Sequence, residues 1–207
     1  MRYFVLETPM DNLTTDALRW KVGTDVALSN GFRFCPPLVP DSSGKADITK
    51  EHLRSMLPVN TNVRTGEVTG QQILDWWEQE PENVFAPDPT KRFGGWVVRC
   101  SGMEMNLISS KPKGSRVNWV KIGGRDLDPA ATYTIAACER EGDPVTTLCR
   151  IQNVRNPQTK SFTLHDVIEE YLKVHSPVSP RIEGRVTATD QPQTLLSQLP
   201  GTGYEFR

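Results

Sequence analysis

The sequence lacks the long apolar runs, the charge excess and the short motifs that would each indicate a class of protein. No apolar run approaches the roughly 20 residues that a helix needs to span a bilayer. The formal net charge is −1 and the isoelectric point is about 6.3, so nothing indicates binding to nucleic acid or to an anionic membrane. The G-x-S-x-G, P-loop and G-x-G-x-x-G motifs are also missing.

Histidines and cysteines are too few and too scattered to predict a metal site. A two-metal hydrolase needs a cluster of Asp, His and Asn ligands, but none of His52, His165 and His175 stands in a D-x-H, G-N-H or G-H-x-H setting. We therefore expect no metal ligand in this chain. The four cysteines form no C-x-x-C pair and indicate no disulfide framework: Cys35, Cys100, Cys138 and Cys149.

What the sequence does contain is typical of one folded domain. It has 207 residues, of which 37% are hydrophobic and 24% charged. Strand-like runs cluster in the centre, and helical patterns lie before and after them: we expect strands over 25–28, 96–101, 104–108, 116–122 and 133–138. This order favours an α+β fold with a mixed β-sheet core flanked by helices.

Several helices have recognisable start signals. Asp11 is a candidate N-cap for a helix that places Leu13, Ala17 and Leu18 on one side. A further helix is expected from Thr49 to the residues before Pro58. Thr69-Gly-Gln-Gln72 and Thr163-Leu-His-Asp166 both have the spacing of a capping box. In the Trp76-Trp77 pair we expect core packing rather than an interface.

The two ends of the chain differ from its middle. We assign residues 1–188 to the domain and residues 189–207, where periodicity is lost, to a partly ordered C-terminal extension. The N-terminus has one basic residue and reaches Glu7 before an apolar region develops, unlike a signal peptide.

The stretch from Pro9 to Phe34 is the most informative one. A helix is followed by the buried run Asp25-Val-Ala-Leu and then by the turn Ser29-Asn-Gly-Phe-Arg33. With later fragments in the same order, it resembles the C-terminal domain of the 5'-nucleotidase family of two-domain metallophosphoesterases. The resemblance extends from about Glu7 to Val186, and the later fragments are 48–58, 68–73, 83–89, 94–103, 124–135 and 182–186.

Details of these fragments resemble the thiosulfohydrolase branch of the family, from the sulfur-oxidation system, more than its nucleotide-hydrolysing members. The Phe32-Arg33 turn and the segment Asn83-Val-Phe-Ala-Pro-Asp-Pro, followed by Gly94-Gly95, match that branch. Nucleotide-hydrolysing members stack the base between two aromatic side chains of this domain. Here the matching positions are Val59, after Leu57-Pro58, and the segment from Cys138 to Pro144, which has no aromatic residue. Both stacking positions are lost, and with them much of the recognition of a base.

The resemblance implies a substrate-binding turn that consists of Asn30, Gly31, Phe32 and Arg33. In the family the arginine reaches into the cleft between the two domains and binds the polar end of the substrate. A guanidinium suits this role because it presents a fixed charge and a fork of donors to an oxyanion. The alternative is that Arg33 pairs with a carboxylate at the end of a strand.

Two further segments are candidates for the lining of the cleft. Phe93, Gly94 and Gly95 could let a ligand approach the backbone, or they could form a tight bend before a strand. Arg140 and Asp143 belong to a charged loop, and such loops are usually solvated without further function.

The resemblance thus implies the substrate-recognition part of a metal-dependent hydrolase, without catalytic residues of its own. Divalent metals of the Mn or Zn type are expected in the metallophosphoesterase domain, encoded in the same gene or acting in trans. The substrate would be a small anion or a group on a carrier protein, and the family's location is periplasmic or extracellular. The alternative is a non-catalytic binding or assembly module that kept the fold.

Overall fold

The computed structural model describes residues 6–31, 38–94 and 96–191. Its helices are α1 (Pro9–Val22), α2 (Lys50–Met56), α3 (Gly70–Gln79), α4 (Glu82–Phe85), the 3-10 helix η1 (Pro89–Lys91) and α5 (Leu164–His175). Its strands are β1 (Val26–Ser29), β2 (Asn62–Thr69), β3 (Arg99–Ser101), β4 (Met103–Leu107), β5 (Val117–Ile122), β6 (Arg125–Asp126), β7 (Thr132–Cys138), β8 (Arg155–Thr163) and β9 (Val186–Ala188).

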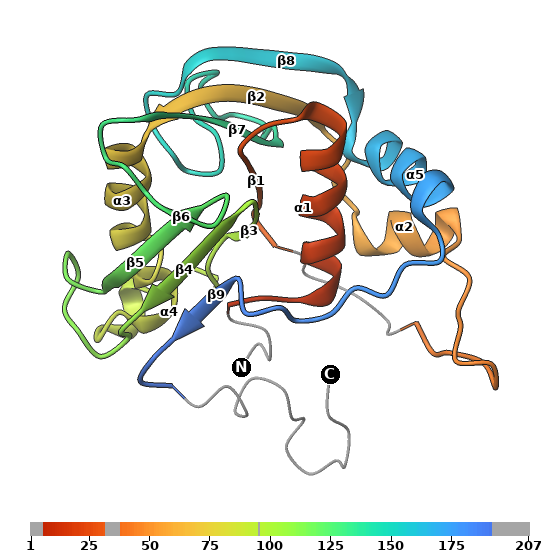
Figure 1. Ribbon diagram of the computed structural model, residues 1–207, viewed down its shortest axis with the longest axis horizontal. Coiled ribbons are helices and arrows are strands. Elements are labelled where there is room, and N and C mark those ends of the chain that lie inside the picture. The colour runs from red at the N-terminus through yellow and green to blue at the C-terminus, as the bar shows by residue number, and fades with distance from the viewer. Residues whose placement is uncertain (1–5, 32–37, 95, 192–207) are drawn as a thin grey trace.

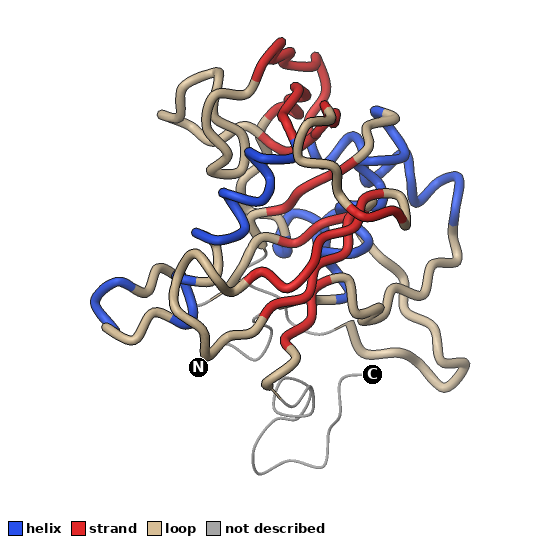
Figure 2. The backbone as a smooth tube through the Cα atoms, turned by 60° about the vertical axis from the view of Figure 1, so that its left-hand side comes forward, coloured by secondary structure: helices blue, strands red, loops and turns tan. Residues whose placement is uncertain are grey.

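The strands form two sheets through the middle of the molecule, with helices on both sides (Figure 2). The larger sheet has the order β3-β1-β7-β2-β8, in which β1 and β7 are parallel and the other pairs antiparallel. The smaller sheet has the order β6-β5-β4-β9, with β9 parallel to β4. This confirms the predicted α+β class with a mixed sheet.

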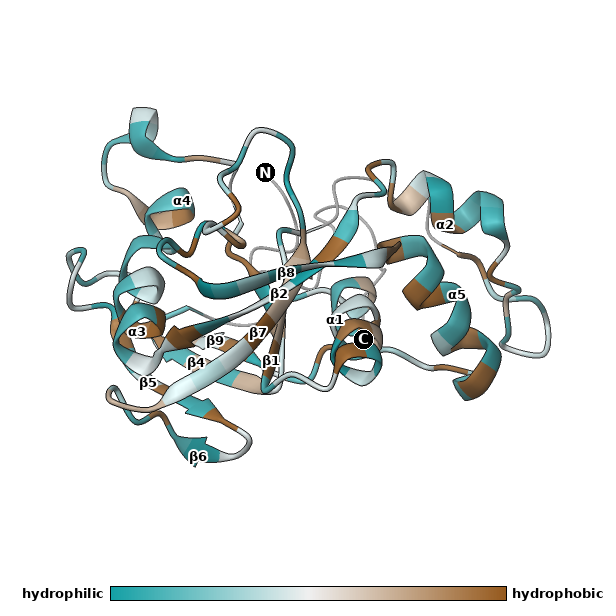
Figure 3. Ribbon diagram, turned by 90° about the horizontal axis from the view of Figure 1, so that it is seen from above, coloured by the Kyte–Doolittle hydropathy of each residue, from teal (hydrophilic) through white to brown (hydrophobic). Residues whose placement is uncertain are grey.

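Alternation along β1 determines what packs on each face of the larger sheet. Val26 and Leu28 belong to the core shared with α3 and the smaller sheet, whereas Ala27 packs with α1, α2 and α5. Figure 1 shows these two groups on opposite sides of the sheet, and Figure 3 shows β2 and β7 running between them from above. Strand β1 is therefore buried on both faces along Val26 to Leu28.

The predicted stripe of the first helix and the two predicted capping boxes are confirmed. Thr69 and Thr163 each accept a hydrogen bond from the backbone three residues on, and the third residue bonds back to the cap. The α1 stripe of Leu13, Ala17 and Leu18 is buried. Trp76 and Trp77 are 5% and 0% exposed, as expected for core residues.

One predicted cap is wrong. Helix α1 begins at Pro9 with Thr8 as N-cap, and Asp11 lies inside the first turn. Proline suits the first helical position because its missing N–H would have no intrahelical partner there. The Asp11 carboxylate accepts from Thr8 Oγ1 at 2.8 Å, and because it is fully buried it also bonds to other elements.

Strands β2, β6, β8 and β9 have no counterpart among the strands predicted from the sequence, and β6 lies in the segment 123–129 that was predicted as a turn. In β2, Arg64 and Gly66 interrupt the apolar pattern: Arg64 is buried against Glu139, and a Cβ on Gly66 would lie 2.3 Å from Val154 Cγ1. Beyond β9, the Asp190 carboxylate accepts from the backbone of Ser109 and Ser110, both at 2.8 Å. Residues 192–207 of the predicted extension lie outside the described residues.

Candidate functional site

The described start of the predicted substrate turn, Asn30 and Gly31, lies at one edge of the larger sheet, where several loops meet. Parallel pairing aligns Ala27 of β1 with Ala136 of β7, so both strands end at the same edge. The antiparallel strands β2 and β3 begin there. The edge is thus surrounded by the loops that follow Ser29, precede Asn62, precede Arg99 and follow Cys138. We call it the open edge.

The start of the turn is anchored from behind by α1. Gly31 N donates to Ser29 Oγ at 3.2 Å, and Ser29 Oγ donates to Asp11 Oδ1 at 3.0 Å. Asp11 also pairs with Arg99, whose Nε lies 3.3 Å from Asp11 Oδ2, and the two side chains are 0% and 3% exposed. The turn is therefore tied to a fully buried ion pair.

Glycine is required at position 31 for two reasons. Its φ of +85° lies in the left-handed region, which strains any side chain. A Cβ there would also lie 2.7 Å from Arg99 Nη1 and 2.8 Å from Trp96 Nε1. The same indole nitrogen donates to Asn30 O at 2.5 Å, so the turn is closed against Trp96.

A distant arginine completes the surroundings of Asn30. Arg150 Nη1 donates to Asn30 Oδ1 at 2.5 Å, while Nε and Nη2 donate to the two oxygens of Glu80 at 2.8 and 2.5 Å. Sequence reasoning missed Arg99 and Arg150. It named Trp96 as the end of the candidate cleft segment but did not predict its contact with the turn, because these residues come from segments 66 to 120 residues away. The one available signal was a charged residue inside the apolar run Leu148-Cys-Arg-Ile151.

The other predicted site residues have different surroundings. Phe32, Arg33 and Gly95 lie outside the described residues. Phe93 is 52% exposed, and a Cβ on Gly94 would lie 2.5 Å from the Trp96 ring, so the bend before β3 is closed on that indole.

Arg140 and Asp143 belong to the loop that follows β7. A backbone hydrogen bond of 3.1 Å from Asp143 N to Arg140 O forms a turn between them. Arg140 is exposed and Asp143 half-buried. Within residues 6–31, 38–94 and 96–191, neither side chain has a hydrogen bond or an ion pair, and no contact joins them to Asn30.

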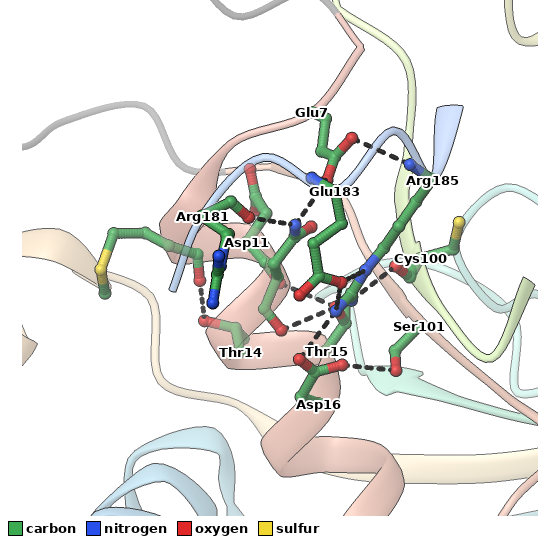
Figure 4. A network of polar contacts seen from close by, with 12 residues as sticks. Glu7, Asp11, Thr14, Thr15, Asp16, Cys100, Ser101, Arg181, Glu183 and Arg185 are labelled. Carbon is green, nitrogen blue, oxygen red and sulfur yellow. Dashed lines mark hydrogen bonds and ion pairs between the residues drawn. The ribbon is translucent and has the colours of Figure 1, made fainter. Parts of the chain in front are cut away.

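A second polar cluster joins α1 to the segment before β9, and we call it the α1 network (Figure 4). Glu7 accepts from three successive backbone N–H groups, of Glu183, Gly184 and Arg185, at 2.7 to 3.0 Å. Arg185 uses all five of its N–H donors, on Thr15, Asp16, Glu183 and the carbonyl of Cys100. Burial raises the pKa of the Cys100 thiol to about 12, so this neighbour stays neutral.

Among the described residues, no group of three or more His, Cys, Asp or Glu side chains is placed to hold a metal ion. His52 completes a capping box with Thr49, His165 contacts the carbonyl of Leu57 and His175 stacks on Tyr171. No helix in this part of the chain is both long and apolar enough to cross a bilayer.

Two surface hollows of about 420 and 410 Å³ share Arg19 and lie near the start of β1, at the sheet edge opposite to the open edge. Neither is lined by a predicted site residue.

Solved structures share this fold. The sulfate thiohydrolase SoxB of Thermus thermophilus is 27% identical, with a TM-score of 0.72 over 91% of this chain and 33% of that one. A 5'-nucleotidase precursor from the same species is 25% identical, with a TM-score of 0.68 over 90% of this chain and 36% of that one.

Among curated proteins, the trifunctional nucleotide phosphoesterase YfkN of Bacillus subtilis is 25% identical over 190 residues, which are 87% of this chain and 12% of that protein. UshA of Escherichia coli is 22% identical over 84% of this chain and 28% of that protein. The chain thus spans between an eighth and about a third of the length of these relatives. The family model for the C-terminal domain of 5'-nucleotidases matches residues 3–139. The chain therefore belongs to the family of 5'-nucleotidase C-terminal domains.

Proposed function

We propose that this domain recognises the substrate of a metal-dependent hydrolase and binds an oxyanion at its open edge. Arg33, Asn30, Gly31 and Phe32 would form the binding turn, and the metals and the attacking water would belong to a metallophosphoesterase domain, in the same protein or in trans. The observation that supports this most directly is the turn itself. Asp11 of α1 supports Gly31 through Ser29, and Trp96 before β3 and Arg150 of the 148–151 turn both donate to Asn30.

Exposed apolar side chains around the open edge support a partner domain there. Val59, Phe93 and Val145 are 70%, 52% and 59% exposed, and they come from three different loops of this edge. Exposed apolar side chains are one feature of a surface that another protein unit covers. The proposed partner is the metallophosphoesterase domain, which would close a cleft over the binding turn.

The proposed substrate is a sulfonate-type group, such as a thiosulfonate on a carrier protein, rather than a nucleotide. Val59 and the loop after Cys138 offer no ring for a base to stack on. The turn instead presents hydrogen-bond donors, which suit the oxygen atoms of an oxyanion. The resemblance of the turn to the thiosulfohydrolase branch supports the same choice.

The test combines this chain with a separately expressed metallophosphoesterase domain of the family. Hydrolysis of a peptide bearing a cysteine S-thiosulfonate and hydrolysis of AMP are measured with and without divalent metal. We expect metal-dependent release from the peptide that exceeds the release from AMP. The Arg33→Ala variant should lose about 10- to 100-fold, because hydrogen bonds to charged groups contribute about 1.5–3 kcal/mol.

Arg125→Ala is the matched control, since Arg125 is an exposed arginine on β6, at the opposite edge. It should leave the rate unchanged. Faster hydrolysis of AMP would reverse the proposed substrate preference. If no such domain produced activity while the chain bound an unrelated protein through the open edge, the chain would be a binding or assembly module instead.

A further inference from the structure

The turn that contains Arg150 has a backbone conformation that its residue types do not favour. Leu148 and Ile151 exchange backbone hydrogen bonds of 3.0 and 2.9 Å around Cys149 and Arg150. Both central residues have positive φ, 47° and 71°. Such a turn normally selects Asn-Gly or Asp-Gly, and each non-glycine residue held there costs on the order of 1 kcal/mol or more. The surrounding contacts must therefore hold this conformation.

Those contacts act mainly on the guanidinium of Arg150. Glu80, which follows α3, is 3% exposed and accepts from two of its nitrogen atoms, so the planar fork is fixed by a bidentate pair. Trp76 Nε1 donates to Cys149 O at 3.1 Å and fixes the backbone of the turn. Burial alone would lower the pKa of Arg150, but the hydrogen bonds and charge of Glu80 outweigh it and raise that pKa. Arg150 therefore stays charged, with its guanidinium held by Glu80.

This geometry determines which way the Asn30 amide faces. A side-chain amide has one acceptor oxygen and one donor NH2 group, and a guanidinium can only donate. With Arg150 Nη1 on Oδ1, a flipped amide would place two donors against each other. The backbone oxygen of Asn30 is also occupied, by Trp96 Nε1. In the part of the chain that the structure describes, Asn30 Nδ2 has no acceptor, and the residue is half-exposed.

We propose that Arg150 is a positioning residue that locks the Asn30 amide with its NH2 donors available to a ligand at the open edge. The site then selects ligands that offer acceptor oxygens, such as a sulfonate, a sulfate or a phosphate, and discriminates against groups that present donors. This inference rests on the proposed function, because it assumes that the ligand binds beside Asn30. It adds a residue, Arg150, that contacts no ligand itself.

The matched ligand pair is methanesulfonate and methanesulfonamide, which have the same shape. The second replaces one oxygen of the anion by a neutral donor NH2, so it lacks both that acceptor and the negative charge. Their affinities, and that of thiosulfate, are measured by titration of the whole chain followed by ¹H–¹⁵N NMR. The unliganded spectrum also reports the Asn30 side-chain NH2 and the Trp96 indole N–H. We expect wild type to prefer methanesulfonate by about 10-fold or more, as for charge-assisted hydrogen bonds.

Two conservative variants avoid leaving Glu80 buried and unpaired. Arg150→Lys keeps the charge but loses the fork; we expect altered Asn30 NH2 resonances and a loss of the methanesulfonate preference to below about 3-fold. Asn30→Asp keeps an acceptor for Arg150 but replaces NH2 by a carboxylate oxygen. This variant should remain as stable as wild type and bind methanesulfonate and thiosulfate at least about 10-fold more weakly.

A purely structural Arg150 would give a different pattern. Arg150→Lys would then lower the unfolding free energy while the Asn30 resonances and the ligand preference stayed as in wild type, which would overturn the inference. Unchanged thiosulfate affinity in Asn30→Asp would overturn it as well. If wild type bound no anion at all, the proposed function would fail, whereas the locking of the amide would still be judged from the unliganded spectra of wild type and Arg150→Lys.

Discussion

The α1 network and the contacts of Arg150 both pair arginine with carboxylate, but they end differently. In the α1 network, all five donors of Arg185 are used, and Glu7 accepts four hydrogen bonds, from Asn12 and three backbone N–H groups. The contacts of Arg150 instead lead to Asn30, whose NH2 group has no acceptor among the described residues. The first arrangement is closed around Arg185, whose donors all find acceptors, although Asn12 Oδ1 is buried there without a hydrogen bond among the described residues. The second ends in a donor at the open edge.

This difference separates a role in stability from a role in binding. The α1 network joins residues that lie far apart in the sequence. Its contacts form where the segment after α5 crosses the N-terminal end of α1 before it reaches β9 (Figure 1). Removing one of its charges should lower stability and affect binding only through the fold. Changes at the open edge should affect ligand affinity more than their cost in stability explains.

The largest expected effect comes from Asp11→Ala. Asp11 and Arg99 are 0% and 3% exposed, so the variant removes this counter-charge from a buried guanidinium. Breaking a buried pair in this way costs about 3–5 kcal/mol. Urea unfolding measures it, with Asp75→Ala as the control. Asp75 is exposed, and among the described residues only Gln71 donates to it. The control should change stability by less than about 0.5 kcal/mol. A loss below about 1 kcal/mol for Asp11→Ala would mean that the pair does not anchor the turn.

Gly31→Ala should have the next largest effect and should lower both stability and ligand affinity. The added Cβ would have a positive φ and would lie 2.7 Å from Arg99 Nη1. Strain and overpacking together should cost about 2–3 kcal/mol. Gly123→Ala is the matched control, because Gly123 has a φ of +58° but nothing within 4 Å of its Cβ position. It should cost about 1 kcal/mol and leave thiosulfate affinity unchanged. Equal losses in the two variants would show that the contacts with Arg99 and Trp96 contribute nothing.

The sequence predicts those features of the two regions that depend on contacts between near neighbours along the chain. Thr69 and Thr163 begin helices because a side chain three residues later can bond back, and this spacing is visible in the sequence. The Asn30-Gly31 turn is likewise predicted, since it follows a short apolar run. Trp96 and Arg150 are not, because their contacts with Asn30 depend on how β1, β3 and β7 are arranged in the sheet.

Burial of polar residues is the second property that periodicity does not show. Asp11 has the residue type and position of an N-cap, yet its carboxylate is fully buried and bonds to Ser29 and Arg99. Arg64 and Gly66 make β2 look unlike a central strand, although one pairs with Glu139 and the other gives room to Val154. In each case a contact with a residue distant in the sequence stabilises a residue that the local pattern does not favour.

The smallest effect is expected at Asp190, which lies just beyond β9 and outside the open edge. Burial alone would raise the pKa of Asp190, but hydrogen bonds from Ser109 and Ser110 outweigh it and lower that pKa to about 2. A carboxyl group whose pKa is lower in the folded state stabilises the fold above its unfolded pKa, near 3.8. That contribution is lost as the pH falls from about 4 to about 2. Because the side chain is exposed, solvent screening limits the effect of Asp190→Asn at pH 7 to less than about 1 kcal/mol.

Urea unfolding of wild type and Asp190→Asn between pH 7 and pH 3 measures this contribution. The difference in unfolding free energy should be constant down to about pH 4 and narrow below it, because the wild-type carboxylate then begins to bind a proton while the asparagine does not titrate. Thiosulfate affinity should be the same in both proteins at pH 7, since Asp190 bonds to the loop after β4 and not to the open edge. A difference that widened on acidification would contradict the assigned hydrogen bonds. A loss of thiosulfate affinity in Asp190→Asn would instead show that Asp190 and the open edge are coupled.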